Sequence, residues 1–278
     1  MSVWIKAGEL VGLHPDDEAV ISVFDHGLTV GDGVFETLKV LGGEPIALSR
    51  HLLRLQRSCK VLGLARPDAD LLRSAVHEVI ASEAQAAHLG RLRITITGGS
   101  GPLASDRHAS AQTAMIALRP MQPWPATTTA TVVPWTRNER SAVAGAKTTS
   151  YAENVVALAW AHERGYSEGL FVNTRGELCE GTGTNVFVVS GEEVFTPPTS
   201  SGCLGGITRE LLLEWGLAHE RVMTLEDLKA ADEVFVTSST RDVHPVLTLD
   251  EQVWDDAGPQ TRFVAAQYVR NIAQNMDP

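Results

Sequence analysis

Short β-forming segments alternate with amphipathic helical segments along the whole chain, and this alternation constrains the fold more than any other feature. Near the start, residues 34–40 alternate β-forming residues, and the pair Gly42-Gly43 predicts a tight turn into a second strand. Ser49 is the expected N-cap of the helix that follows. The other elements predicted in this part are helices over 50–64 and 69–83 and strands over 91–98 and 113–120. This pattern predicts a small N-terminal domain of the α+β class.

The second half of the chain is richer in strands. Strands are predicted over 130–135, 168–174, 177–181, 184–189, 193–197, 233–240 and 243–250, and helices over 151–165, 207–216, 225–230 and 263–274. Between the two halves lies MQPWPATTT, which is rich in proline and threonine and is typical of a linker. We therefore predict a small domain over 1–120, a linker over 121–128 and a larger domain over 129–278.

Composition narrows the class of protein. The chain has 278 residues, 44% of them hydrophobic, which is enough for packed cores in two domains. Its net charge of −11, without a lysine- and arginine-rich run, argues against a nucleic-acid partner. The N-terminus lacks the basic and apolar regions of a signal peptide, and no apolar run approaches the ~18 residues that span a bilayer. Three widely spaced cysteines, Cys59, Cys179 and Cys203, argue against a zinc site or a disulfide framework. We expect a soluble, cytoplasmic protein without membrane partners.

Lysine is scarce in this chain. Arginine supplies 18 of the 23 basic residues, and the five lysines are Lys6, Lys39, Lys60, Lys147 and Lys229. Lys147 lies among small residues, in AVAGAKTTSYAENV, just before a predicted helix. It is interpreted either as a solvated loop lysine or as an amine held in a cleft. An amine in a cleft can form a Schiff base with a carbonyl group once its pKa falls from ~10.4.

Two further segments carry groups that could act with such an amine. Glu180 ends a predicted strand before a glycine-rich turn, where a carboxylate could face the pyridine nitrogen of pyridoxal phosphate. Gly205-Gly206 open a predicted helix, and free backbone N–H groups at a helix start suit an anion. The hydroxyl run 237–240 follows a strand and could donate to the same anion.

Together these segments resemble the class IV aminotransferases, the fold-type IV pyridoxal phosphate enzymes. The signature around the pyridine-binding glutamate is matched by Glu180, Thr182, Asn185, Val186, Phe187, Val194, Thr196, Leu204, Gly206, Ile207 and Arg209. Residues 25–40 resemble the family's N-terminal hairpin, 50–55 the following helix, 147–173 the lysine segment and 232–246 the late phosphate loop. The resemblance implies a small α/β sandwich, a larger C-terminal pseudo-barrel, pyridoxal phosphate as cofactor, and a homodimer.

The resemblance also implies a role for each matching residue. Lys147 is expected to hold the cofactor as a Schiff base and to move the substrate proton, and Glu180 to pair with the pyridine nitrogen. Leu204 is expected to pack against the cofactor ring, and Tyr151 to approach the ring hydroxyl. The expected phosphate ligands are Arg54, Gly206, Ile207, Thr208, Ser238, Ser239 and Thr240.

The substrate pocket departs from the family's D-amino-acid enzymes. Phe35, Gly98 and Ser100 stand where those enzymes usually carry a tyrosine, an arginine and a histidine. A substrate carboxylate still needs charged donors, and the candidates are Arg93, Arg107, Arg137 and Arg241.

We predict an aminotransferase that moves the amino group between D-amino acids, such as D-alanine or D-glutamate, and 2-oxo acids by a ping-pong mechanism. The alternatives are an aminodeoxychorismate lyase, which releases pyruvate and 4-aminobenzoate, a branched-chain aminotransferase, and a non-catalytic protein that kept the fold.

Overall fold

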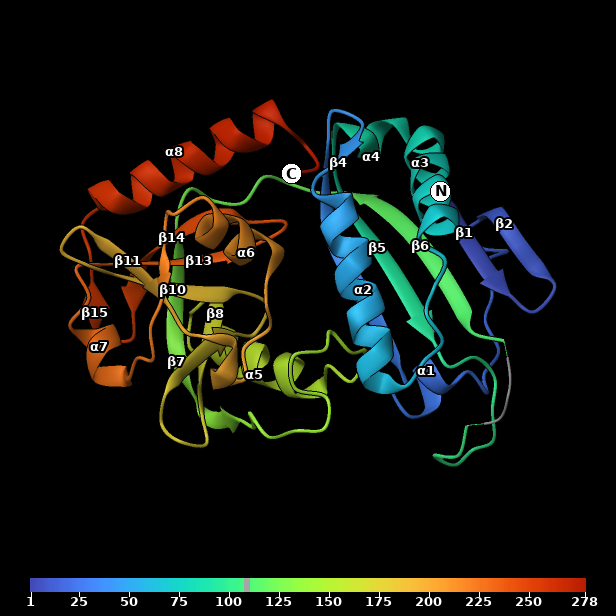
Figure 1. The fold of residues 1–278 in the computed structure, drawn as a ribbon, viewed down its shortest axis with the longest axis horizontal. Helices are drawn as coiled ribbons and strands as arrows, with labels where there is room; N and C mark the ends of the chain where they lie inside the picture. Colours follow the sequence, from blue (N-terminus) through green and yellow to red (C-terminus); the bar gives the residue numbers. More distant parts are fainter. Residues whose placement is uncertain (108–110) are drawn as a thin grey trace. The chain divides into compact units, whose positions relative to one another are not determined.

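The structure, a computed structural model, describes residues 1–107 and 111–278 (Figure 1). The chain divides into two compact units. The first contains 1–123, 146–151 and 276–278, and the second contains 124–145 and 152–275. The first boundary, after Pro123, lies inside the predicted linker, but two later segments return to the first unit. The predicted division into one early and one late domain therefore differs from the observed one.

The first unit is built on a single antiparallel sheet with the strand order β2-β1-β6-β5-β3-β4. Its strands are β1 (Ser2–Ala7), β2 (Leu10–Pro15), β3 (Gly33–Leu41), β4 (Glu44–Pro45), β5 (Leu89–Thr97) and β6 (Thr113–Pro120). The predicted hairpin at 34–48 and the strands near 91–98 and 113–120 are confirmed. The hairpin of β1 and β2 is not part of the sequence-based prediction.

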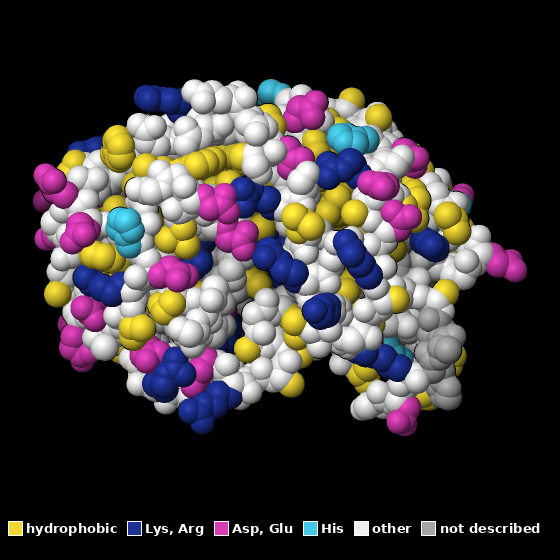
Figure 2. Space-filling view, viewed as in Figure 1, with side chains coloured by type: hydrophobic (Ala, Val, Ile, Leu, Met, Phe, Trp, Pro, Cys, Tyr) yellow, Lys and Arg dark blue, Asp and Glu magenta, His cyan; other side chains and the backbone are white. Residues whose placement is uncertain are grey.

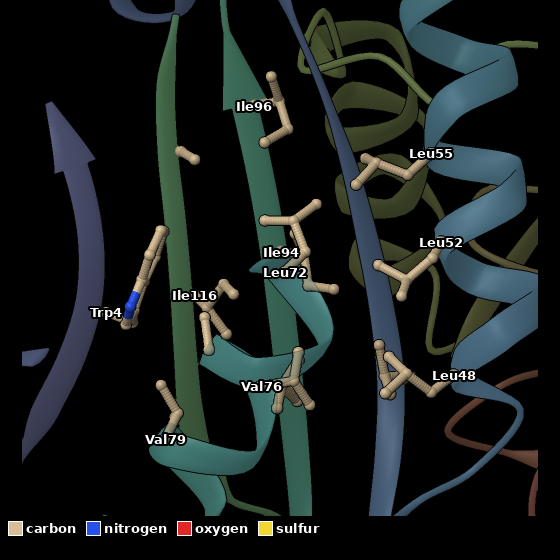
Figure 3. Packing of buried hydrophobic residues seen from close by; sticks show 14 of the residues in the cluster. Trp4, Leu48, Leu52, Leu55, Leu72, Val76, Val79, Ile94, Ile96 and Ile116 are labelled. Atoms are coloured by element: carbon tan, nitrogen blue, oxygen red, sulfur yellow. The ribbon is translucent and has the colours of Figure 1, made fainter. Parts of the chain in front are cut away.

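Helices α2 (Leu48–Leu62) and α3 (Ala69–Ser82) pack on one face of this sheet, and α1 (His26–Thr29) and α4 (Ala84–His88) are short. The core between the helices and the sheet is built from alternate strand residues and from one stripe of each helix (Figure 3). It includes Leu48, Leu52, Leu55, Leu72, Val76, Val79, Ile94, Ile96 and Ile116. Because the strand residues of this core alternate along the chain, the residues between them, such as Phe35 and Arg93, lie on the opposite face of the sheet.

The start of α2 differs from the prediction. Ala47, not Ser49, is the N-cap residue, and it makes no side-chain capping hydrogen bond. The last residues of the chain cap the helix instead. Asp277 Oδ1 accepts from the Ser49 N–H at 2.8 Å, Asp277 Oδ2 accepts from Ser49 Oγ at 2.6 Å, and Ala47 N donates to Met276 O at 2.7 Å. A carboxylate distant in sequence thus satisfies a helix terminus that the local sequence leaves open.

Residues 147–149 join the first unit because they continue its sheet. Phe35 N donates to Lys147 O at 2.9 Å, and Thr149 N donates to Gly33 O at 2.8 Å. The segment thereby covers the edge of β3 that β4, paired only at Val40 and Leu41, leaves open. This pairing takes Lys147 out of the predicted larger domain.

The second unit is built on a curved mixed sheet in the order β12-β11-β10-β13-β14-β7-β8-β9, with β15 beside β14 (Figure 1). Its strands are β7 (Thr128–Arg137), β8 (Glu168–Asn173), β9 (Leu178–Gly181), β10 (Asn185–Ser190), β11 (Glu193–Thr196), β12 (His219–Glu220), β13 (Glu233–Ser238), β14 (Asp242–Leu249) and β15 (Gln252–Val253). Its helices are α5 (Ala152–Glu163), η1 (Thr199–Ser201), α6 (Ile207–Glu214), α7 (Leu225–Lys229) and α8 (Pro259–Gln274). The α+β class is confirmed.

The core of the second unit is formed by apolar residues of β8, β10, β13 and β14, which α7 helps to cover. The rings of Phe187 and Phe235 stack with centroids 4.7 Å apart. At the surface, acidic and basic side chains are interspersed over the face shown in Figure 2. Among the residues that the structure describes, no helix has the length and hydropathy of a membrane crossing.

Candidate active site

The Lys147 segment is anchored in the first unit at both backbone polar groups. Lys147 O accepts from Phe35 N, and Lys147 N donates to Ser58 Oγ on α2 at 3.1 Å. Its side chain lies over aromatic rings. Lys147 Nζ is 4.5 Å from the ring centroid of Phe35 and 5.6 Å from that of Tyr151, and the two rings meet edge to face at 5.3 Å. The strand pairing thus holds the primary amine of Lys147 against the aromatic rings of Phe35 and Tyr151, which we call the aromatic wall.

Arg93 joins the same cluster from the neighbouring strand. Thr37 and Arg93 are register partners of β3 and β5, so the Arg93 side chain lies on the same face as Phe35. Its Cζ is 3.6 Å from the Phe35 ring centroid. Within the described part of the chain, no carboxylate forms an ion pair with Arg93. A guanidinium without a carboxylate partner can bind an acidic substrate.

The other three candidate arginines are already held by acidic side chains. Arg107 pairs with Asp32 and also donates to Leu62 O at 2.5 Å. Arg137 pairs with Glu153 and lies beside Glu180. Arg241 stacks on Trp124 at 4.1 Å, and its Nη2 is 3.6 Å from Glu168 Oε2.

Gly98 occupies the position at which the D-amino-acid enzymes of the resembled family carry an arginine. A Cβ placed on Gly98 would lie 2.5 Å from Asp32 Oδ2. Asp32 is itself held by Arg107, with a hydrogen bond of 2.7 Å from Arg107 Nε. The Asp32–Arg107 pair therefore fills the space that a side chain at residue 98 would need.

Arg54, an expected phosphate ligand, lies in a buried polar cluster between α2 and β3. Its Nε donates to Glu36 Oε1 at 2.9 Å and its Nη2 to Glu36 Oε2 at 2.6 Å, while His51 Nδ1 lies 2.6 Å from Glu36 Oε2. Burial would raise the pKa of Glu36, but the charge and hydrogen bonds of Arg54 and the hydrogen bond of His51 outweigh it and lower the pKa to about 2. Burial lowers the pKa of His51, so its imidazole is neutral at pH 7.

Glu36 and His51 carry no role in the sequence-based interpretation. Glu36 could have been found from its position in β3, because it lies on the same face of the strand as the apolar residues Val34 and Leu38. A glutamate on the buried face of a strand needs a cationic partner, and α2 supplies one.

In the second unit, the Glu180 carboxylate is held at both oxygens. Leu204 N donates to Glu180 Oε2 at 2.9 Å, and Arg137 Nε lies 3.2 Å from Glu180 Oε1. The Leu204 carbonyl accepts from Asn185 Nδ2 at 2.8 Å. The structure therefore brings Glu180, Leu204 and Arg137 together, and it fixes the backbone of Leu204 from both sides.

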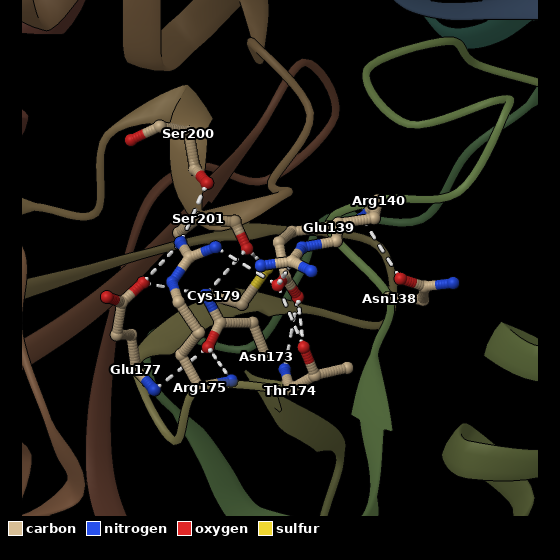
Figure 4. Close-up of polar contacts among 10 residues, drawn as sticks. All are labelled: Asn138, Glu139, Arg140, Asn173, Thr174, Arg175, Glu177, Cys179, Ser200 and Ser201. Carbon is tan, nitrogen blue, oxygen red and sulfur yellow. Dashed lines mark hydrogen bonds and ion pairs between the residues drawn. The ribbon is translucent and has the colours of Figure 1, made fainter.

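A polar network holds η1, the turn that precedes Leu204 (Figure 4). Side chains of the β8–β9 hairpin donate to its carbonyl groups: Arg175 to Ser200 at 3.0 Å, and Asn173 and Cys179 to Ser201 at 3.2 and 3.3 Å. Glu139 in turn accepts from Arg175 Nη1 at 3.0 Å. The loop that leads to the start of α6 is thus set by the sheet.

The start of α6 has the properties of an anion site. Its N-cap, Gly206, provides no side-chain cap, so the first N–H groups have no capping partner there. A Cβ on Gly206 would lie 2.0 Å from Asn185 Oδ1, so only glycine allows this close approach. Thr237, the register partner of Asn185, has a buried Oγ1 without a hydrogen-bond partner in the described residues. Ile207 and Thr208 are buried in the first turn of the helix.

The late hydroxyl loop follows β13. Ser238 Oγ lies 3.5 Å from Thr240 Oγ1 and accepts from Arg241 N at 3.2 Å, and Ser239 is partly exposed. The uncapped helix start and the orphan hydroxyl of Thr237 fit a phosphate group. Among the described residues, no group of three His, Cys, Asp or Glu side chains could hold a metal ion.

Comparison with known proteins decides the family. The model of the amino-transferase class IV family matches residues 33–249. The chain belongs to the class IV aminotransferases. Enzymes of this family use pyridoxal phosphate.

Curated relatives of this aminotransferase differ in activity. A putative branched-chain-amino-acid aminotransferase of Methanocaldococcus jannaschii is 31% identical over 86% of this chain and 85% of its own. An aminodeoxychorismate lyase of Bacillus subtilis is 29% identical over 92% and 91%, and a D-alanine aminotransferase of Bacillus licheniformis is 28% identical over 92% and 93%. Among solved structures, a branched-chain aminotransferase of Thermoproteus uzoniensis with norvaline has a TM-score of 0.89 and 29% identity, covering 99% of this chain and 95% of that chain. The predicted fold-type IV architecture is confirmed.

Proposed function

We propose that this class IV aminotransferase moves the amino group between branched-chain L-amino acids and 2-oxo acids by a ping-pong mechanism. The observation that carries the proposal is the cluster of Lys147, Phe35, Tyr151 and Arg93. The aromatic wall beside the lysine amine suits an apolar substrate side chain. Arg93, without an acidic partner among the described residues, suits a substrate carboxylate.

The surroundings of Gly98 favour this substrate class over D-amino acids. Asp32 occupies the space of a side chain at residue 98, so the arginine typical of the D-amino-acid enzymes has no equivalent here. The branched-chain relatives at 31% and 29% identity add support. D-amino acids stay the second candidate, because a D-alanine aminotransferase is 28% identical over 92% of the chain.

When bound, pyridoxal phosphate supplies an electron-accepting ring that stabilises the negative charge released at the substrate Cα. We assign Lys147 as the residue that binds the cofactor and whose Nζ removes and returns the Cα proton. Glu180 would pair with the ring nitrogen through its carboxylate. Leu204 would pack against the ring, and Tyr151 would lie near the ring hydroxyl.

We propose a set of ligands for the cofactor phosphate. In the second unit, the start of α6 donates N–H groups of Gly206, Ile207 and Thr208. Hydroxyl groups of Ser238, Ser239 and Thr240 complete that side. In the first unit, Arg54 contributes its charge, in an orientation that Glu36 fixes through two hydrogen bonds.

We also propose that the enzyme is a homodimer. Segment 20–30 of the first unit exposes several large apolar side chains, among them Val20 (65%), Val23 (68%), Phe24 (50%) and Leu28 (63%). Apolar surface gathered in this way is typical of a protein interface. Sedimentation equilibrium should give twice the chain mass of 29.9 kDa, and a monomer at micromolar concentration would contradict the proposal.

Half-reactions with single amino acids test the proposed substrate. The purified holoenzyme is mixed with L-isoleucine, L-valine, D-alanine or D-glutamate, and conversion to the pyridoxamine form is followed by absorbance. The branched-chain L-amino acids should react fastest. Arg93→Gln should lower kcat/KM by about 100-fold, because a charged bidentate contact is lost, while Arg91→Gln on the same strand should change it little.

Each other outcome of this experiment favours one alternative. Faster reaction with D-alanine supports the D-amino-acid candidate. Release of pyruvate from aminodeoxychorismate without any pyridoxamine form supports the lyase. A protein that shows no visible cofactor band, or a Lys147→Ala variant that keeps the band, overturns the enzyme assignment itself.

A further inference from the structure

Arg137, a candidate for the substrate carboxylate, is committed to a different contact. It ends β7, and its guanidinium lies over the ring of Phe171, with Cζ 4.2 Å from the ring centroid. Phe171 is the register partner of Glu180 across β8 and β9. The strand pairing therefore brings Arg137 to the Glu180 carboxylate, where Arg137 Nε lies 3.2 Å from Oε1.

Helix α5 holds the far end of the same guanidinium. Arg137 Nη1 pairs with the Glu153 carboxylate, and Nη1 and Nη2 each lie 3.2 Å from Asn154 Oδ1. Asn154 is fixed in turn, because its Nδ2 donates to Thr182 O at 2.5 Å. Because Nη1 and Nη2 are hydrogen-bonded, Nε is ion-paired with Glu180 and only 15% of the side chain is exposed, Arg137 is poorly placed to bind a substrate carboxylate.

The Glu180 carboxylate thus lies between a positive charge and a hydrogen-bond donor: Arg137 forms an ion pair with Oε1, and the Leu204 amide donates to Oε2. Both favour the ionised form, since neither a guanidinium nor an amide N–H can accept a proton from a carboxylic acid. Arginine stays charged at any physiological pH, so its effect on the carboxylate is permanent.

We propose that Arg137 is a positioning residue that keeps Glu180 ionised and fixed, so that the proton shared with the cofactor ring resides on the ring nitrogen. Arg137 acts through Glu180 and contacts neither substrate nor reacting atoms. Glu153 and Asn154 orient Arg137. The proposal rests on the role assigned to Glu180 above.

The test compares Arg137→Met and Arg137→Lys with the wild-type holoenzyme. Arg140→Met is the matched control, because Arg140 lies three residues away with 82% of its side chain exposed. The main readout is the ¹⁵N chemical shift of the ring nitrogen in bound ¹⁵N-labelled pyridoxal phosphate, which separates the protonated from the neutral ring. Arg137→Met should move the signal toward the neutral value, Arg137→Lys should move it less, and Arg140→Met should leave it in place. An unchanged signal in Arg137→Met overturns the proposal.

A second measurement excludes a merely structural role. Each protein is also reconstituted with a pyridoxal phosphate analogue whose ring nitrogen is replaced by carbon. Arg137→Met should lower the rate of the half-reaction at least about tenfold with the natural cofactor but less than about twofold with the analogue. Equal losses with both cofactors, or a raised KM with unchanged kcat, would contradict the proposal, because they indicate misfolding or substrate binding.

Glu153→Gln serves where Arg137→Met fails to fold. It weakens the hold on Arg137 from α5 and should shift the ¹⁵N signal in the same direction by a smaller amount, and no shift counts against the proposal. Failure of the proposed function has a separate signature. If the ¹⁵N signal of Glu180→Gln stays at the wild-type chemical shift, Glu180 does not face the ring nitrogen. The role assigned to Glu180 is then wrong, whatever Arg137 does.

Discussion

At the scale of single residues, the contact partners of a side chain decide its role in this enzyme. The four candidate arginines have different surroundings: Arg107, Arg137 and Arg241 face carboxylates, whereas Arg93 faces an aromatic ring. A guanidinium that already has a carboxylate partner gains little from a second one. The choice of Arg93 for the substrate therefore follows from electrostatics within the first unit, not from the position of the residue in the chain.

Glu36 gives a prediction about pH at this scale. Its pKa is lowered to about 2 from 4.5, so the stability that it contributes is complete above pH about 4.5 and is lost as the pH falls toward 2. The shift corresponds to about 3 kcal/mol. His51 adds to the loss in acid, because its pKa is also lowered and the unfolded chain binds its proton below pH 6.5.

Glu36→Gln should remove this acid dependence and lower the free energy of unfolding at pH 7 by about 3 kcal/mol, since Arg54 then stays buried without a counter-charge. Urea denaturation between pH 3 and pH 7 measures both effects. Glu44→Gln, an exposed change on β4, is the control. If the free energy of unfolding of Glu36→Gln and of the wild type changes with pH in the same way, Glu36 is not ionised in the cluster with Arg54 and His51.

At the scale of elements, α2 shows how a helix start can depend on residues far away. Asp277 supplies the cap that Ala47 cannot, across 228 positions of sequence. Asp277→Ala should lower the free energy of unfolding by about 1 kcal/mol, the usual effect of losing an N-cap. Asp255→Ala, at an exposed site, should change it by less than about 0.5 kcal/mol. Equal effects of the two variants in thermal denaturation would mean that Asp277 does not cap α2.

The start of α6 gives a second prediction for an element. Gly206→Ala places a Cβ 2.0 Å from Asn185 Oδ1, so the start of α6 must move away from Asn185. We therefore expect the dissociation constant for pyridoxal phosphate to rise at least about tenfold. Gly205→Ala is the matched control, because its Cβ would lie 3.2 Å from Glu210 Oε1, the end of a flexible side chain, and at an ordinary 3.9 Å from Thr199 Cγ2. Equilibrium dialysis measures both constants, and equal affinities of the two variants would contradict the assignment of the anion site.

Local patterns predicted many of these elements and missed those that depend on distant partners. Alternation in residues 89–97 and 113–120 is visible in the sequence because each strand buries one face. Strand β1 was missed, since its partner β6 lies more than 100 residues away, with Val3 opposite Ala117. The sequence predicts Ser49 as the N-cap for the same reason: nothing near residue 49 indicates that Asp277 caps the helix.

Within the candidate site, sequence motifs identify the residues whose side-chain chemistry sets their role. The three-dimensional structure is needed for residues whose role depends on which groups they contact. Lys147 and Glu180 stand out in the sequence because few residue types can do what is assigned to them. The distinction between Arg93 and Arg137 cannot be read from the sequence, because it depends on strand register: Thr37 opposite Arg93, and Phe171 opposite Glu180.

For the whole molecule, the scarcity of lysine makes the central claim open to a single experiment. Only five lysines are present, and Lys147 alone lies in a segment that the sheet of the first unit holds beside Phe35 and Tyr151. The cofactor must therefore be bound at Lys147 and at no other lysine.

Borohydride reduction of the wild-type holoenzyme, followed by proteolysis and mass spectrometry, tests this requirement most directly. The account predicts one pyridoxyl phosphate group per chain, on the peptide that contains Lys147, and none in Lys147→Arg treated in the same way. Label on Lys6, Lys39, Lys60 or Lys229, or label that persists in Lys147→Arg, would contradict it.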